Sequence, residues 1–171
     1  MLKSGLDAIF HRGPDDTGIE AFDDALLGFS RLSIIDLANG HQPFKKLGHT
    51  MIFNGEIYNY QTIKKDLVSQ GYTFETTSDT EVLLTSYLAY GEKCVEKLRG
   101  MFTFLIYDET NHKMFGAADH FGIKPLYYTE NEDFVAFSSE YKALLPLLET
   151  RTVDETALQS YLSFQFVPMG K

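Results

Sequence analysis

The pattern of hydrophobic and polar residues divides the chain into groups of strands and helices. Residues 25–35 are rich in branched and aromatic side chains, which favours a strand. The apolar run 50–53 then meets Asn54-Gly55 and Glu56-Ile57-Tyr58, a pattern that predicts a two-stranded hairpin. Apolar residues follow at helical spacing, and they predict helices over 60–70, 79–90 and about 91–98.

Strand patterns return after Gly100, over 101–107, 113–118, 125–128 and 134–137. A helix is expected over about 139–148, and Asp154 is placed to cap a last helix. At the start of the chain, residues 8–17 are interpreted as a helix end that passes into a loop at Gly13-Pro14. Strands, helices, hairpins and helices in that order indicate an α+β architecture with mostly antiparallel sheet.

Composition narrows the classes of function. The 171 residues fit one domain, with 44% hydrophobic and 14% aromatic residues. The formal net charge of −9 repels phosphate backbones and anionic lipids, so neither a nucleic acid nor a membrane is expected as a partner. A single cysteine, Cys94, argues against a disulfide framework and makes the cytoplasm the expected compartment. The five histidines lack ligand spacing, and no metal site is predicted.

Asn54-Gly55 has two interpretations. Between apolar runs this pair is the strongest short-range signal for a type I′ turn, and most such turns carry no chemistry. The polar residues Glu56 and Asn59 beside it favour a functional role. A tetrahedral intermediate needs donors aimed at its oxygen, and the Asn54 side chain and the Gly55 N–H can supply two.

Asp79 and Arg31 are the charged candidates. Ser78-Asp79-Thr80-Glu81 fits a capping box, in which Ser78 caps the helix and Glu81 reaches back to it. A carboxylate fixed at a helix start can also receive an α-ammonium group, so capping and ligand binding are compatible at Asp79. Arg31 lies in an apolar strand, and two interpretations of it stay open. Its side chain either points to solvent or binds a carboxylate through two hydrogen bonds.

Two reactive residue types receive structural interpretations. His11 belongs to the turn-forming phrase His11-Arg12-Gly13-Pro14-Asp15-Asp16 and has no nucleophile near it in sequence. Cys94 lies at a helical position between charged residues, where a small packing residue is the better interpretation.

Five phrases occur together and in a fixed order. They are His11-Arg12-Gly13-Pro14-Asp15-Asp16, Arg31-Leu32-Ser33-Ile34-Ile35-Asp36, Phe53-Asn54-Gly55-Glu56-Ile57-Tyr58-Asn59, Ser78-Asp79-Thr80-Glu81 and Gly122-Ile123-Lys124-Pro125-Leu126-Tyr127-Tyr128. With these phrases the chain resembles the N-terminal glutaminase domain of glutamine-hydrolysing asparagine synthetases, which are class II glutamine amidotransferases. By this resemblance, residues 1–150 are the glutaminase domain, and residues 151–171 are a C-terminal helix and the start of the connection to a synthetase domain.

The resemblance implies a fold and a set of residue roles. The fold is the N-terminal-nucleophile hydrolase sandwich, four layers in the order αββα with two stacked antiparallel sheets, and its first strand is missing from these residues. Arg31 would hold the α-carboxylate of L-glutamine, and Asp79 and Glu56 would receive its α-amino group. Asn54 and Gly55 would form the oxyanion hole. The backbone that lines the pocket would come from Leu32, Ser33, Ile34 and Ile35.

The resemblance also implies a reaction. A cysteine exposed as the first residue attacks the side-chain amide of glutamine, giving a γ-glutamyl thioester and ammonia, and hydrolysis then releases glutamate. The ammonia serves the ATP-dependent synthesis of asparagine from aspartate in a second domain. Neither that cysteine nor that domain has a counterpart in this sequence. We therefore assign no catalytic residue, expect no cofactor here, expect ATP and Mg only in the synthetase domain, and expect this chain not to hydrolyse glutamine.

Two further functions stay open. One is a non-catalytic module that binds glutamine without turnover. The other is the amidotransferase domain of a related enzyme with another acceptor, such as a cell-surface sugar, an antibiotic or a peptide. A missing strand would leave backbone groups unpaired and apolar surface bare, which predicts a homodimer or ready aggregation.

Overall fold

The computed structural model describes residues 2–13, 16–31 and 41–167. A four-stranded antiparallel sheet forms its centre, with neighbouring strands β3 (Phe44–Lys46), β4 (His49–Ile57), β5 (Gly100–Asp108) and β6 (Lys113–Ala118). Two smaller antiparallel sheets pair β1 (Asp16–Ala21) with β2 (Leu26–Arg31) and β7 (Tyr127–Glu130) with β8 (Val135–Ser138).

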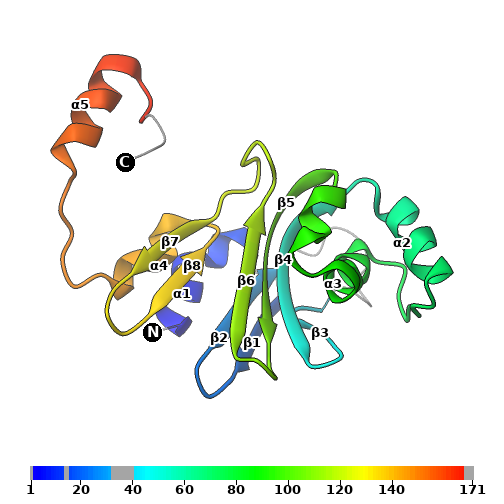
Figure 1. Ribbon diagram of the computed structural model, residues 1–171. Coiled ribbons are helices and arrows are strands. Elements are labelled where there is room, and N and C mark those ends of the chain that lie inside the picture. Colours follow the sequence, from blue (N-terminus) through cyan, green and yellow to red (C-terminus); the bar gives the residue numbers. More distant parts are fainter. Residues whose placement is uncertain (1, 14–15, 32–40, 168–171) are drawn as a thin grey trace.

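Helices cover the sheets from two sides (Figure 1). The helices α2 (Tyr60–Ser69) and α3 (Asp79–Tyr90) lie beside the four-stranded sheet, whereas α1 (Leu2–Ala8) and α4 (Tyr141–Leu144) lie beside the smaller sheets. Three short 3-10 helices are η1 (Phe10–Arg12), η2 (Gly91–Lys97) and η3 (Leu145–Leu147). The helix–sheet–sheet–helix order confirms the α+β sandwich that the sequence predicts.

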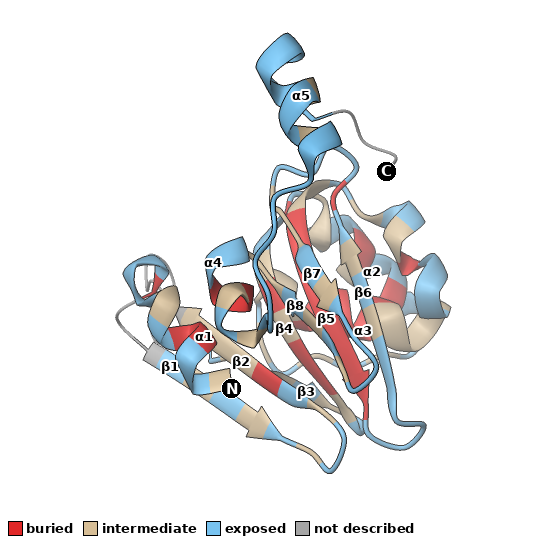
Figure 2. Ribbon diagram, turned by 90° about the vertical axis from the view of Figure 1, so that its left-hand side faces the viewer, coloured by how far each residue is buried: buried red, intermediate tan, exposed pale blue. Residues whose placement is uncertain are grey.

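The hydrophobic core lies between the four-stranded sheet and the helices α2 and α3. Buried side chains concentrate on β4, β5 and α3 (Figure 2). Every residue of α3 from 81 to 86 is buried, because this helix is covered on more than one side. The fully buried anchors include Met51, Ile57, Leu83, Leu84 and Ile106. This packing fixes the end of β4 against the start of α3.

The predicted hairpin at Asn54-Gly55 is wrong. Strand β4 continues through both residues, and its register pairs Asn54 with Thr103 and Gly55 with Phe102. Gly55 has φ 143°, and a Cβ there would lie 2.1 Å from the Met101 carbonyl oxygen, so the glycine serves a close approach of two strands. The turn of the β3–β4 hairpin is Leu47-Gly48, where both residues have positive φ.

Other elements match their sequence predictions with local differences. The helices over 60–70 and 79–90 are confirmed as α2 and α3. The segment 91–98 forms a 3-10 helix, and the expected helix over 139–148 divides into α4 and η3, which has a proline in its first turn. Strand β1, which contains Gly18, was not predicted because it lacks a branched apolar run.

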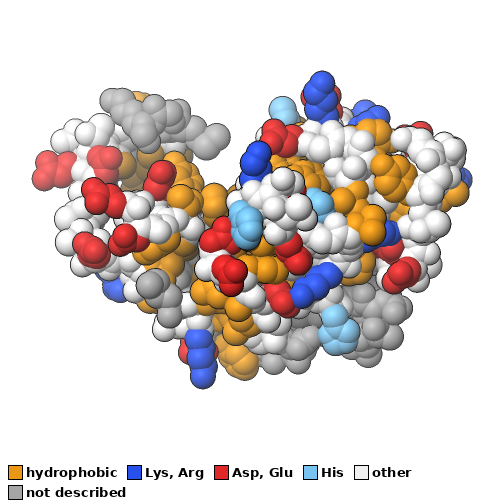
Figure 3. Space-filling view, turned by 60° about the horizontal axis from the view of Figure 1, so that its bottom comes forward, with side chains coloured by type: hydrophobic (Ala, Val, Ile, Leu, Met, Phe, Trp, Pro, Cys, Tyr) orange, Lys and Arg blue, Asp and Glu red, His pale blue; other side chains and the backbone are white. Residues whose placement is uncertain are grey.

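The last helix, α5 (Glu155–Phe164), is capped as predicted. Asp154 Oδ1 accepts from the N–H groups of Thr156 and Ala157, at 2.8 and 3.0 Å. The helix has no buried residue, and an extended segment carries it away from the sheets (Figure 1). Elsewhere on the surface, acidic and hydrophobic side chains share the face shown in Figure 3.

Within the described ranges, none of the helices is long and apolar enough to span a membrane. Those same ranges hold no group of three or more His, Cys, Asp or Glu residues that could bind a metal ion.

Candidate functional site

The Gly55 N–H points away from β5. Phe102, its partner there, donates its N–H to Asp119 Oδ2 at 3.2 Å, and its carbonyl accepts from the Asp119 N–H at 2.7 Å, both toward β6. Antiparallel strands alternate hydrogen-bonded and non-hydrogen-bonded pairs, so Gly55 and Phe102 form a non-hydrogen-bonded pair. The Gly55 N–H therefore points to the edge of β4 that the short strand β3 does not reach.

Two side chains hold that edge of β4, one on either side of Gly55. The Gln42 amide replaces a strand at Phe53: its Oε1 accepts from the Phe53 N–H at 2.6 Å, and its Nε2 donates to the Phe53 carbonyl at 2.9 Å. The Ile57 N–H donates to Asp79 Oδ2 at 3.0 Å. Within the described part of the chain, no hydrogen bond occupies the Gly55 N–H between them. Among the described residues it is thus a donor without an acceptor.

Asp79, the first residue of α3, has its carboxylate at the end of β4 beside Glu56. Burial raises the pKa of Asp79, and the negative charge of Glu56 adds to this rise, which outweighs the hydrogen bond from the Ile57 N–H. Two neighbouring carboxylates of this kind favour a cation between them. The arrangement suits an ammonium group.

The side chains of β4 alternate between the two faces of the sheet. Phe53 and Ile57 are buried in the core against α3, whereas Asn54 is half-buried and Glu56 is exposed on the other face. The structure thus brings together four of the predicted site residues, Asn54, Gly55, Glu56 and Asp79, at the junction of β4 and α3.

The remaining predicted site residues are described only in part. Arg31 is the last residue of β2, opposite Asp16 in the register. The side chain of Arg31 and the whole of Leu32, Ser33, Ile34 and Ile35 lie outside the described residues.

The capping box at the start of α3 is half right. Ser78 Oγ accepts from the Glu81 N–H at 3.3 Å, as predicted. The Glu81 carboxylate does not reach back to Ser78. It turns to the preceding segment, where it accepts from the N–H groups of Glu75 and Thr76, and the Ser78 N–H donates to Thr76 Oγ1 instead. The segment before α3 is therefore hydrogen-bonded to the first turn of the helix through Glu81.

The contacts of Cys94 and His11 indicate structural rather than catalytic roles. Cys94 is fully buried, and burial raises the pKa of its thiol to about 12, so the thiol is neutral and unreactive near neutral pH. His11 Nε2 lies 3.3 Å from Glu140 Oε1, to which Arg12 also donates at 3.1 Å. Both sequence interpretations agree with these contacts.

Sequence reasoning missed two polar residues that shape the site, Gln42 and Asp119, and misjudged a third, Asn59. Gln42 holds β4 through its amide, and Asp119 accepts from the N–H groups of Phe121, Ile123 and Lys124 beside β5. Asn59, interpreted as a sign of function, binds the Lys97 carbonyl and the Arg99 N–H at 2.9 Å each and is structural. No local pattern marks these roles, because every partner except the loop of Asp119 is distant in sequence.

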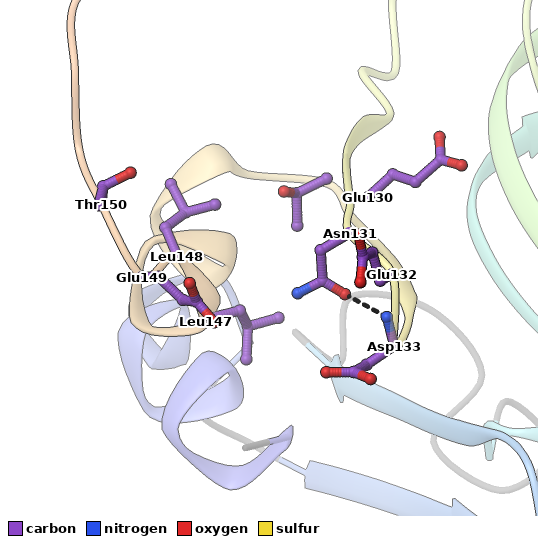
Figure 4. Close-up of a pocket in the computed structure, with 9 residues that line it drawn as sticks. Glu130, Asn131, Glu132, Asp133, Leu147, Leu148, Glu149 and Thr150 are labelled. Atoms are coloured by element: carbon purple, nitrogen blue, oxygen red, sulfur yellow. Dashed lines mark hydrogen bonds between the residues drawn. The ribbon is translucent and has the colours of Figure 1, made fainter.

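A separate cavity of about 330 Å³ lies between the β7–β8 turn and the segment after η3 (Figure 4). Leu147 and Leu148 face Asn131 and Asp133 across it, and the Asp133 N–H donates to Asn131 Oδ1 at 3.0 Å. None of the predicted site residues lines this cavity.

Comparisons with known proteins agree on one family. A sequence model described as "Glutamine amidotransferase domain" matches residues 1–171. Asparagine synthetase [glutamine-hydrolyzing] 1 of Bacillus subtilis (strain 168) is 51% identical over 98% of this chain and 27% of its own length. Asparagine synthetase B [glutamine-hydrolyzing] of Escherichia coli (strain K12) is 41% identical over 89% of this chain and also 27% of its own length. The chain thus spans 27% of the length of both curated relatives.

The fold also matches solved structures. The glutamine phosphoribosylpyrophosphate amidotransferase from B. subtilis, complexed with ADP and GMP, aligns with a TM-score of 0.64 and 27% sequence identity. The alignment covers 82% of this chain and 39% of that chain.

Proposed function

Because the chain belongs to the glutamine amidotransferase domain family, we propose that the junction of β4 and α3 binds L-glutamine and serves its hydrolysis to glutamate and ammonia. One observation carries the proposal. The Gly55 N–H is left without an acceptor among the described residues, while Gln42 and Asp79 hold the strand on both sides of it.

The α-amino group of glutamine binds Asp79 and Glu56. Its positive charge satisfies both carboxylates, and the raised pKa of Asp79 falls once the ammonium is bound. The proposal assigns the α-carboxylate to Arg31 and the pocket wall to the backbone of 32–35, in accordance with the resemblance in sequence. A guanidinium binds a carboxylate through two parallel hydrogen bonds, which fixes the orientation of the ligand.

The side-chain carbonyl of glutamine lies against Asn54 and Gly55. Thiol attack turns this carbonyl oxygen into an oxyanion, and the Asn54 amide and the Gly55 N–H donate to it. The attacking thiol is not that of Cys94, whose side chain is buried and whose pKa is about 12. For the 171 residues of this sequence we therefore propose glutamine binding without turnover.

The relatives suggest the wider reaction. Both curated relatives are named as glutamine-hydrolysing asparagine synthetases. We infer that the ammonia serves ATP-dependent asparagine synthesis in the cytoplasm, with a synthetase domain as partner. ATP and Mg belong to that domain, and the glutaminase chemistry uses a thiol and hydrogen-bond donors without a cofactor. Residues 151–171 form the connection, and residues 1–150 the glutaminase unit.

Calorimetric titration of the 171-residue chain with L-glutamine tests the site. We expect binding that Asp79→Asn weakens about tenfold or more, since a hydrogen-bonded charge pair contributes roughly 1.5–3 kcal/mol. Asp66→Asn is the matched control, because Asp66 lies on α2 and accepts from the Tyr90 hydroxyl at 2.7 Å, away from the site. A folded chain that does not bind L-glutamine, or an Asp79→Asn variant that binds as tightly as the parent, would overturn the proposal.

A further inference from the structure

Glu81 is a buried carboxylate that the glutamine site does not use directly. Its side chain, 1% exposed, lies in the first turn of α3. The N–H of Glu75 donates to it at 3.0 Å, and Thr76 donates both its N–H at 2.6 Å and its hydroxyl at 2.8 Å. A surface carboxylate does not collect this many donors, so the position is built to hold a charge.

Lys46 supplies the opposite charge from β3. Its Nζ donates to Glu81 Oε1 at 2.7 Å and to the Thr73 carbonyl at 2.8 Å, and it lies 5.0 Å from the centre of the Phe74 ring. Burial alone would raise the pKa of Glu81, but the hydrogen bonds from Lys46 and Thr76 lower it to about 2. The carboxylate is ionised throughout the neutral range.

This ion pair fixes the segment that leads into Asp79. Thr73 is bound to Lys46, and Thr76 is bound to Glu81. Lys64 of α2 donates to the Thr76 carbonyl at 2.7 Å, which ties the same segment to a second helix. Residues 73–78 therefore have contacts to β3, α2 and α3 immediately before the residue that faces the ligand.

We propose that Lys46 and Glu81 are positioning residues for the α-amino group of glutamine. Their ion pair holds residues 73–78 and so sets the start of α3, where Asp79 reaches the Ile57 N–H and its carboxylate faces Glu56. Neither residue touches the ligand in this assignment. The inference rests on the proposed function. It adds that the Lys46–Glu81 ion pair orients the Asp79 carboxylate, which binds the ammonium group.

Comparison of two ligands separates positioning from general stability. Glutaramate is glutamine without its α-amino group, so the ratio of its Kd to that of L-glutamine measures the ammonium contact alone. In the 171-residue chain, Lys46→Met is expected to lower this ratio about tenfold, because Asp79 loses its fixed direction. Lys45→Met is the matched control: Lys45 is the preceding residue of β3 and pairs with Glu20 at the surface, and its loss leaves the ratio unchanged.

Thr76 gives a milder variant that keeps the ion pair. Thr76→Val removes the hydroxyl that donates to Glu81 and is expected to lower the ratio about threefold, whereas Thr76→Ser keeps the hydroxyl and the parent ratio. This pair decides the question if Lys46→Met does not fold. A folded Thr76→Val variant with the parent ratio would overturn the inference.

Hydrogen exchange without ligand separates this inference from the proposed function. The Ile57 N–H is protected by Asp79, and the Phe53 N–H of the same strand is protected by Gln42. We expect Thr76→Val to speed exchange at Ile57 and not at Phe53. Failure of the parent chain to bind glutamine would refute the proposed function, whereas unchanged exchange at Ile57 would refute the positioning role by itself.

Discussion

The backbone conformation of Gly55 determines its proposed role in the chemistry. Its φ of 143° and the approach of the Met101 carbonyl to 2.1 Å from a Cβ leave no room for a side chain. The same close approach holds Gly55 in a pair whose N–H groups point outward from β4 and β5. A glycine here makes the donor accessible and keeps the two strands in contact.

Gly55→Ala is therefore expected to lower the free energy of unfolding by about 3 kcal/mol or more, from backbone strain and a steric clash together. Urea unfolding measures the loss. Gly71→Ala is the control, because Gly71 also has positive φ, at 95°, but a Cβ there meets nothing within 4 Å. It carries the strain without the clash, and equal losses in the two variants would show that the approach to Met101 does not matter.

At the same scale, the lowered pKa of Glu81 predicts that the free energy of unfolding depends on pH. Its folded pKa of about 2 lies below the ordinary value of 4.5, so its ionised form stabilises the folded state above about pH 4.5. This contribution is lost as pH falls from about 4.5 through about 2. Glu81→Gln is expected to be less stable at pH 7 and to lose less free energy of unfolding over that acid window, as measured by urea unfolding at several pH values. An equal loss in parent and variant over the window would contradict the assignment.

At the scale of elements, the site depends on the junction of β4 with α3 and on the segment that precedes β3. The helical periodicity of 60–70 and 79–90 is local, and the sequence predicted both helices. Asn54-Gly55 was misread because the strand that requires it, β5, begins at Gly100. Asp79 and Glu56 were proposed as partners through family resemblance, and the contact that brings them together joins residues far apart in sequence.

Gln42 shows the limit of sequence reasoning most clearly. Its amide completes the ladder at Phe53, a role that depends on the tertiary position of the chain before β3. Gln42→Leu leaves the Phe53 N–H and carbonyl unpaired and is expected to cost about 1–3 kcal/mol of stability in urea unfolding. Gln61→Leu is the control, since Gln61 is exposed on α2 and, among the described residues, donates only to the Tyr60 hydroxyl, at 3.4 Å. A cost no larger than that of the control would mean that the Gln42 amide does not contribute to holding β4 at Phe53.

At the scale of the whole molecule, α5 differs from the other long helices because none of its residues is buried. The core residues lie on β4, β5, α2 and α3, whereas α5 exposes Leu158, Tyr161 and Leu162 at 45%, 55% and 73%. An apolar stripe at helical spacing that contacts no core favours association with another surface. The homodimer, which was predicted from a missing strand, stays a prediction.

The exposure of α5 leads to a test of the division at residue 150. A helix with no buried side chain contributes little to the free energy of unfolding, so a chain of residues 1–150 is expected to keep the stability of the full chain within about 0.5 kcal/mol. Its Kd for L-glutamine is also expected to be unchanged, because the junction of β4 and α3 contains no residue beyond 150. Thermal unfolding and calorimetry of the two chains measure both quantities. A lower unfolding temperature for the shorter chain would show that α5 packs onto residues 1–150 in solution, and the boundary would then have to move past Phe164.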